Sequence, residues 1–161
     1  MRTDHSLCPS AEFELNGEVV FGMVGGSAQE RRVIYLRQAV PIEQVDISRL
    51  NGITPGEVFR VAGTCAKDNC AHHDGDSQQC SLVNRIVEKA PVVTSELAYC
   101  AIRHSCVWWG QHGRSACERC SQVVSRDLMP SEELAEARIP PNRQNISSDI
   151  NTQSSAVQSG G

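Results

Sequence analysis

Seven of the eight cysteines in this 161-residue chain fall within one stretch, residues 65–120. They are spaced as C-x4-C-x9-C and then as C-x5-C-x10-C-x2-C, at Cys65, Cys70, Cys80, Cys100, Cys106, Cys117 and Cys120. Two histidines, His72 and His73, lie among the first three. Thiolates and imidazoles at such short intervals are the usual ligands of a metal ion or a metal cluster. The stretch therefore predicts a metal centre.

The other common use of so many cysteines is in disulfide bonds, and the redox compartment decides between the two. The sequence has no apolar run long enough for the core of a secretory signal, and none that approaches the ~18 residues of a membrane span. We therefore expect a cytoplasmic protein without membrane association. Its cysteines would stay reduced there, which favours metal binding over disulfides.

Seven cysteines and one histidine would complete two four-coordinate sites. A local partition groups Cys65, Cys70 and Cys80 with either His72 or His73, and leaves an all-cysteine set of Cys100, Cys106, Cys117 and Cys120. A second partition interleaves the two halves and gives one four-cysteine cluster beside a three-cysteine site with an open position. The spacing alone does not choose between them.

The spacing favours iron–sulfur chemistry over zinc. Structural zinc sites usually contain two short C-x2-4-C pairs, and only Cys117 and Cys120 form a tight pair of this kind. Iron–sulfur clusters accept thiolates scattered over loops and helix ends, and an excess of cysteine over histidine also suits them. We predict one or two clusters of the 4Fe–4S type bound by the seven cysteines, with zinc, or one cluster and one zinc, as the alternative.

The remaining candidate residues have simpler interpretations. Cys8 precedes Pro9 near the N-terminus and is predicted to be a free thiol in a flexible lead. The Cys70-Ala-His72 step matches one half of a Rieske site, but the second half is missing. Trp108 and Trp109 are expected to shield the metal centre from water. Nearby arginines are expected to balance the charge of the thiolates, namely Arg85, Arg103, Arg114 and Arg119.

The sequence singles out no catalytic residue. There is no Ser-His-Asp set, no paired-carboxylate motif and no phosphate-binding loop. Residues 65–126 contain seven Lys and Arg against six Asp and Glu, so no basic stripe suggests nucleic-acid binding. The expected role is an electron-transfer or redox-sensing accessory to a protein partner. A zinc-stabilised interaction module is the alternative, and an enzyme would require the open three-cysteine site.

The elements that must position these ligands predict an α+β fold. Residues 1–11 are expected to be a flexible lead, and residues 12–139 a single domain. Its β-rich half, 12–62, is predicted to form a small N-terminal antiparallel sheet with a hairpin turn at Asn16-Gly17. A cysteine-rich loop-and-helix module follows at 63–126, then a short helix within 127–139 with Ser131 as N-cap. Residues 140–161 are polar and are expected to be a disordered tail.

Overall fold

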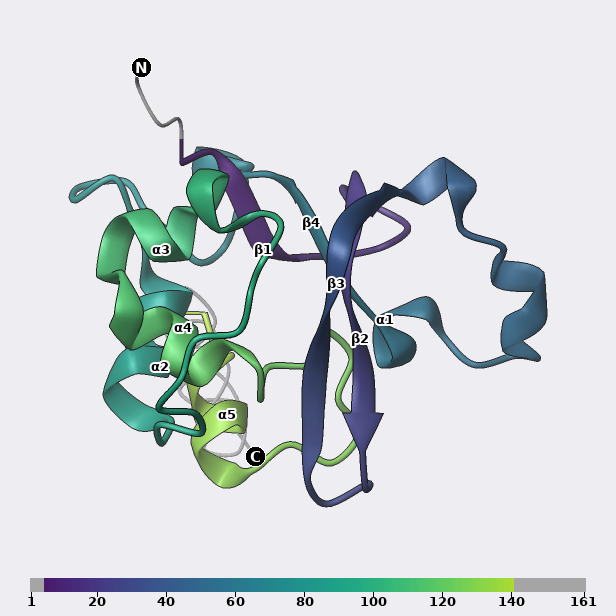
Figure 1. Cartoon of the computed structure of the whole chain (residues 1–161). Coiled ribbons are helices and arrows are strands. Elements are labelled where there is room, and N and C mark those ends of the chain that lie inside the picture. The colour runs from purple at the N-terminus through teal and green to yellow at the C-terminus, as the bar shows by residue number, and fades with distance from the viewer. Residues whose placement is uncertain (1–4, 141–161) are drawn as a thin grey trace, which may run out of the picture.

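A computed structural model describes residues 5–140 of the chain, and it has an α+β fold (Figure 1). The strands are β1 (Leu7–Ala11), β2 (Val19–Gly26), β3 (Arg31–Pro41), β4 (Phe59–Thr64), β5 (His73–Asp74) and β6 (Gln79–Cys80). The α-helices are α1 (Pro55–Val58), α2 (Ser81–Lys89), α3 (Val107–His112), α4 (Arg114–Cys120) and α5 (Glu132–Ala137). Short 3-10 turns are η1 (Ile42–Gln44), η2 (Ile47–Leu50), η3 (Lys67–Asn69) and η4 (Arg103–Ser105). No helix in this part of the chain is both long enough and apolar enough to cross a membrane.

The main sheet has the strand order β1-β4-β2-β3, with every neighbouring pair antiparallel. β2 and β3 are rich in β-branched and aromatic residues, which suit a pleated surface. Helices α2 to α5 gather beside this sheet in Figure 1, whereas α1 lies near β2. A separate two-stranded sheet, β5-β6, lies inside the cysteine-rich half, so strands are not confined to the N-terminal half.

The N-terminal lead was predicted incorrectly for residues 7–11. These residues form β1, which pairs with β4 and buries Pro9 and Ala11. The expected strand over 12–15 is also absent: the chain turns there, and the amide of Gly17 donates to the carbonyl of Glu12. Backbone pairing with a distant strand orders the lead, and a local pattern does not reveal such pairing. Residues 1–4 and 141–161, which include nearly all of the predicted tail, lie outside the described residues.

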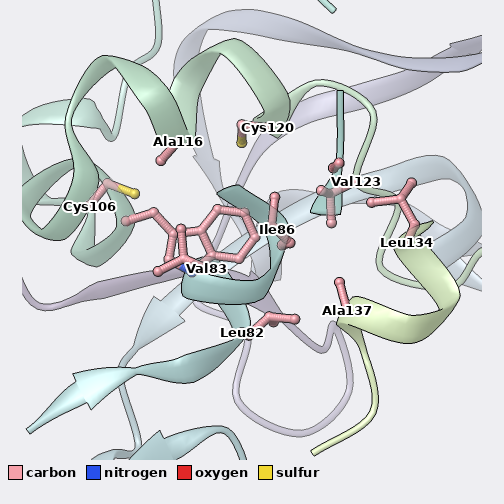
Figure 2. Close-up of a cluster of buried hydrophobic side chains, with 11 residues drawn as sticks. Leu82, Val83, Ile86, Cys106, Ala116, Cys120, Val123, Leu134 and Ala137 are labelled. Atoms are coloured by element: carbon pink, nitrogen blue, oxygen red, sulfur yellow. The ribbon is translucent and has the colours of Figure 1, made fainter. Parts of the chain in front are cut away.

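The helical half has its own core, which contains two cysteines. Figure 2 shows Cys106 and Cys120 facing the same interior as Val83 and Ile86. Trp108 is also part of this core and is 1% exposed. α2 lies within the predicted loop-and-helix module of residues 63–126, and Cys80 is the residue before its first turn. The helix α5 was also predicted, and its N-cap Ser131 accepts a hydrogen bond from the amide of Leu134 at 3.3 Å.

Candidate metal centre

Four cysteines from four separate segments approach one another, and we call them the first cysteine set. They are Cys8 in β1, Cys65 just after β4, Cys70 at the end of η3 and Cys80 just before α2. All four line one cavity of about 510 Å³. Cys65, Cys70 and Cys80 also lie close enough to Cys8 to raise the pKa of its thiol. The structure thus gives Cys65, Cys70 and Cys80 a cysteine neighbour that the sequence-based partition did not include.

Strand pairing explains why Cys8 reaches this cavity. Cys8 is opposite Gly63 in the β1–β4 ladder, and the amide of Cys65 donates to the carbonyl of Ser6 at 2.8 Å. Gly63 also lets the turn at Asn16 lie close against β4, because a Cβ at that position would lie 2.0 Å from the Asn16 carbonyl oxygen. The prediction that Cys8 lies in a flexible lead is therefore wrong. The thiol is free, but it belongs to a hydrogen-bonded strand.

The second cysteine set consists of Cys100, Cys106, Cys117 and Cys120, the same four residues that the local partition grouped. They line a cavity of about 20 Å³ in the helical half. Cys117 and Cys120 are both in α4, as their spacing predicted. A turn was expected between Gly110 and Gly113. α3 instead continues through Gly110 to His112, and the helix ends at Gly113, whose φ is 58°. The break lets α4 follow α3 directly and brings Cys117 and Cys120 back towards Cys106.

The two candidate histidines line the first cavity but have other partners in this structure. His72 Nδ1 is 2.9 Å from an Arg85 guanidinium nitrogen. Burial, assisted by the Arg85 charge, lowers the pKa of His72 to about 4, so its ring is neutral. His73 Nδ1 is 3.2 Å from the Asp68 carboxylate, although the orientation is too poor for a hydrogen bond.

Burial favours the protonated form of five of the eight thiols. It raises the pKa of both Cys8 and Cys106 to about 12. The pKa values of three further thiols are also raised by burial, those of Cys80, Cys100 and Cys117. A metal that binds these groups must displace their protons.

Backbone amides next to the thiols act in the opposite direction. The amides of Val83 and Leu82, at the start of α2, lower the pKa of Cys80. Those of Trp109 and Trp108 do the same for Cys106 at the start of α3. N–H donors aimed at a sulfur stabilise its thiolate form. Both sets therefore contain a thiol that a helix start prepares for metal ligation.

Arg60 connects the two cysteine sets and was missed by the sequence analysis. This residue of β4 is 0% exposed. Its Nε donates to the carbonyl of Pro9, next to Cys8, at 2.6 Å. Its Nη1 donates to the carbonyls of Cys120 at 2.9 Å and Val123 at 2.6 Å. The available signal was an arginine inside the apolar run Val58-Phe59-Arg60-Val61-Ala62, where burial is expected on one face.

The buried charge of Arg60 has no carboxylate within salt-bridge distance among residues 5–140. Its guanidinium carbon lies 5.5 Å from the ring centre of Phe21 and 5.4 Å from that of Trp108. Trp108 lines both cysteine cavities. The space between the two sets is therefore occupied by one cation and one indole ring.

Several buried donors near the cysteines lack a hydrogen-bond partner in this part of the chain. They include Arg60 Nη2, Arg103 Nε and Trp108 Nε1. Buried donors normally have partners, because leaving one unpaired costs about 1–3 kcal/mol. Arg103 and Trp108 line the second cavity. Thiolates and inorganic sulfide accept hydrogen bonds, so an anionic cluster bound by the cysteines would fit these surroundings.

The four arginines expected to balance charge divide into two groups. Arg103 acts on the thiols directly, since its side chain lies close enough to Cys117 to offset part of the rise in pKa that burial causes in that thiol. Arg85 lies near enough to Cys80 for the two charges to interact. Arg114 pairs instead with Glu118 at 2.7 Å, and Arg119 donates to the carbonyls of Ala90 and Ser115 at 2.8 Å each.

The geometry within the sets differs from that of a single-ion site. A zinc ion with Zn–S bonds of about 2.3 Å holds its sulfurs about 3.8 Å apart. No three His, Cys, Asp or Glu side chains among residues 5–140 converge closely enough to hold one metal ion. All eight cysteines are free thiols, and no disulfide joins any of them.

Comparison of the chain with protein-family models, with curated proteins and with solved structures gave no match.

Proposed function

We propose that this protein binds two iron–sulfur clusters, one at each cysteine set, and transfers electrons or senses redox state for a protein partner. The first cluster would be held by Cys8, Cys65, Cys70 and Cys80, and the second by Cys100, Cys106, Cys117 and Cys120. The observation that carries the proposal is the division of all eight free thiols into two groups of four around two cavities. Four thiolates are the usual ligand set of a 4Fe–4S cluster.

The size of the first cavity favours a cluster over a single ion. In a cubane each thiolate binds a different iron, so the four sulfurs lie farther apart than around one zinc ion. The first cavity, at about 510 Å³, has room for such a group. The second cavity, at about 20 Å³, would have to widen, so we expect α3 and α4 to adjust when the second site is loaded.

The complete ligand sets favour electron transfer over catalysis. An open three-cysteine site would let a substrate bind to iron. Such a site arises only when seven cysteines are divided into a set of four and a set of three. With Cys8 included, both sets have four thiols. The chemistry that a cluster supplies when bound is the gain and loss of one electron.

The residues of the chain would then have defined tasks. The helix-start amides near Cys80 and Cys106 would donate hydrogen bonds to the ligating sulfurs, which raises the reduction potential. Trp108 would exclude water from both sites, since it is buried and lines both cavities. Arg60 would offset the negative charge of the ligated thiolates from its position between the sets.

Anaerobic purification followed by a reductive titration tests the proposal. We expect a brown protein with broad absorbance from thiolate-to-iron charge transfer, which bleaches on reduction while an electron-paramagnetic-resonance signal develops. A colourless anaerobic preparation containing stoichiometric zinc and no redox-dependent signal would replace the proposal with the zinc-stabilised interaction module. In that case Cys-to-Ser changes would unfold the domain without affecting any redox property.

A further inference from the structure

A wide groove runs along β3 on the side of the chain that carries the second cysteine set. Its volume is about 1020 Å³, and its opposite wall is the irregular segment between α2 and η4. β3 is an edge strand of the main sheet, so this wall is not covered by another strand. The amide of Val33 does donate to the carbonyl of Ser121 at 2.7 Å, which fastens the strand to the end of α4 at one place.

The groove carries positive charge although the whole chain has a net charge of −4. Three arginines line it, Arg32, Arg37 and Arg103, against the single carboxylate of Glu96. Arg37 is exposed and forms no salt bridge with any residue in 5–140. Arg32 pairs with Glu30, but that contact is open to solvent and therefore weak. The groove thus offers a positive surface on a protein that is acidic overall.

The groove is continuous with the second cysteine set. Tyr35, Arg103 and Cys117 line both the groove and the small cavity that the four cysteines enclose. Burial raises the pKa of Tyr35, and the neighbouring Cys120 thiol raises it further, so this ring is uncharged and lies against the set. A molecule seated in the groove would therefore lie beside Cys117, a member of the second set, with Tyr35 and Arg103 as the other shared side chains.

The composition of the walls suits a protein surface. Two large apolar side chains on the walls are exposed, Ile34 at 64% and Tyr99 at 68%. Tyrosine and arginine are enriched in protein interfaces. At about 1020 Å³ the open groove also lies at or above the upper end of the size range of small-molecule pockets, about 300–1,000 Å³.

We propose that this groove docks an acidic redox protein, which exchanges electrons with the second cysteine set through the Tyr35–Arg103–Cys117 wall. The proposal rests on the proposed function, since it assigns the electron-exchange surface of the same protein. Complementary charge would speed the encounter and orient the partner, and it would make the rate depend on salt.

The test uses a reduced acidic flavodoxin as the probe and the anaerobically purified full chain as the acceptor. Stopped-flow reduction is compared at ionic strengths of about 0.01 M and about 0.15 M, where the Debye lengths are about 30 Å and about 8 Å. Reduced methyl viologen, a small cation, serves as a reductant that the groove does not attract. Arg37→Glu is the groove variant. Arg49→Glu is the matched control, because Arg49 is 87% exposed, is outside the groove and gives the same change in net charge.

We expect the flavodoxin rate to fall about tenfold in Arg37→Glu at low salt and the difference to shrink at the higher salt. Arg49→Glu should behave like the wild type, and the viologen rate should not fall in either variant. Equal flavodoxin rates in the two variants, or an unchanged rate in Arg37→Glu, would overturn the docking site.

A calorimetric titration with oxidised flavodoxin separates the docking proposal from the proposed function. Binding that is weakened by Arg37→Glu in a protein without iron would refute the cluster assignment and leave the docking site standing. A protein with iron that shows no dependence on Arg37 in either measurement would refute the docking site alone.

Discussion

Arg60 Nη1 donates a hydrogen bond of 2.9 Å to the main-chain carbonyl of Cys120, while Nε of the same guanidinium donates to the carbonyl of Pro9, the residue after Cys8. A single buried side chain therefore fastens β1, β4 and the end of α4 together. β1 contains Cys8 of the first set, β4 leads into Cys65 of the same set, and α4 contains Cys117 and Cys120 of the second set. The rigid fork of an arginine can serve several acceptors at fixed angles, which a lysine cannot do.

Replacing Arg60 with methionine should destabilise the protein by about 3 kcal/mol or more. The carbonyls of Pro9 and Val123 would lose the guanidinium donors, and the Cys120 carbonyl would keep only the amide of Val123. Each buried group left unpaired costs about 1–3 kcal/mol. Arg60→Lys should be intermediate, because it keeps the charge but not the geometry. Urea unfolding measures both, with Arg49→Met as a surface control expected to stay within about 0.5 kcal/mol of wild type. Wild-type stability in Arg60→Met would show that the guanidinium does not fasten β1, β4 and the end of α4 together.

Changing Cys8 to serine should remove about half of the bound iron and sulfide. Cys8 belongs to the first set by position, and serine is a poor ligand for an iron–sulfur cluster. His72→Gln and His73→Gln should retain full iron, because His72 and His73 have Arg85 and Asp68 as neighbours. Iron and acid-labile sulfide assays on the three variants decide the matter. Full iron in Cys8→Ser together with loss in either histidine variant would restore the three-cysteine, one-histidine set.

Gly63→Ala should weaken the protein by about 1–3 kcal/mol and lower iron loading at the first set. The new methyl group would lie 2.0 Å from the Asn16 carbonyl oxygen, so the turn before β2 and the β1–β4 pairing would have to shift. Gly75→Ala is the matched control within the cysteine-rich loop, since nothing lies within 4 Å of the methyl group it would add. Thermal unfolding and iron content measure both variants. Equal behaviour would mean that Cys8 is not positioned by the ladder.

Removal of the metal should change the surroundings of Trp108. The cavity of the second set is only about 20 Å³, so its walls must move apart on loading and close again on removal. Trp109→Phe leaves Trp108 as the single tryptophan. Quenching by iron changes the intensity of its fluorescence, so the wavelength of the emission maximum is the quantity to measure. We expect the maximum to shift after anaerobic chelation, and Cys106→Ser to show the shifted position beforehand. An emission maximum that is identical with and without metal would exclude the rearrangement.

The features that the sequence predicted correctly are those set by neighbours in the chain. Strands within 12–62, helices within 63–126 and the N-cap at Ser131 all follow from local patterns. The pairing of Cys117 with Cys120 in α4 is also local. Cys100, Cys106, Cys117 and Cys120 line one cavity, as in one of the two partitions considered, but the spacing alone did not choose between those partitions.

The features that the sequence did not predict depend on contacts between distant segments. Cys8 joins the first set because β1 pairs with β4, more than fifty residues away, and Cys8 has no local partner that would indicate this. Arg60 is buried because the carbonyls of Pro9, Cys120 and Val123 surround it.

Iron and acid-labile sulfide analysis of the anaerobically purified chain tests the central claim most directly. Two 4Fe–4S clusters predict about eight iron and about eight sulfide per chain. The same analysis should give about four of each when any one cysteine of either set is changed to serine. Zinc in place of iron, or a metal-free chain with all eight thiols available to a thiol reagent, would contradict the account.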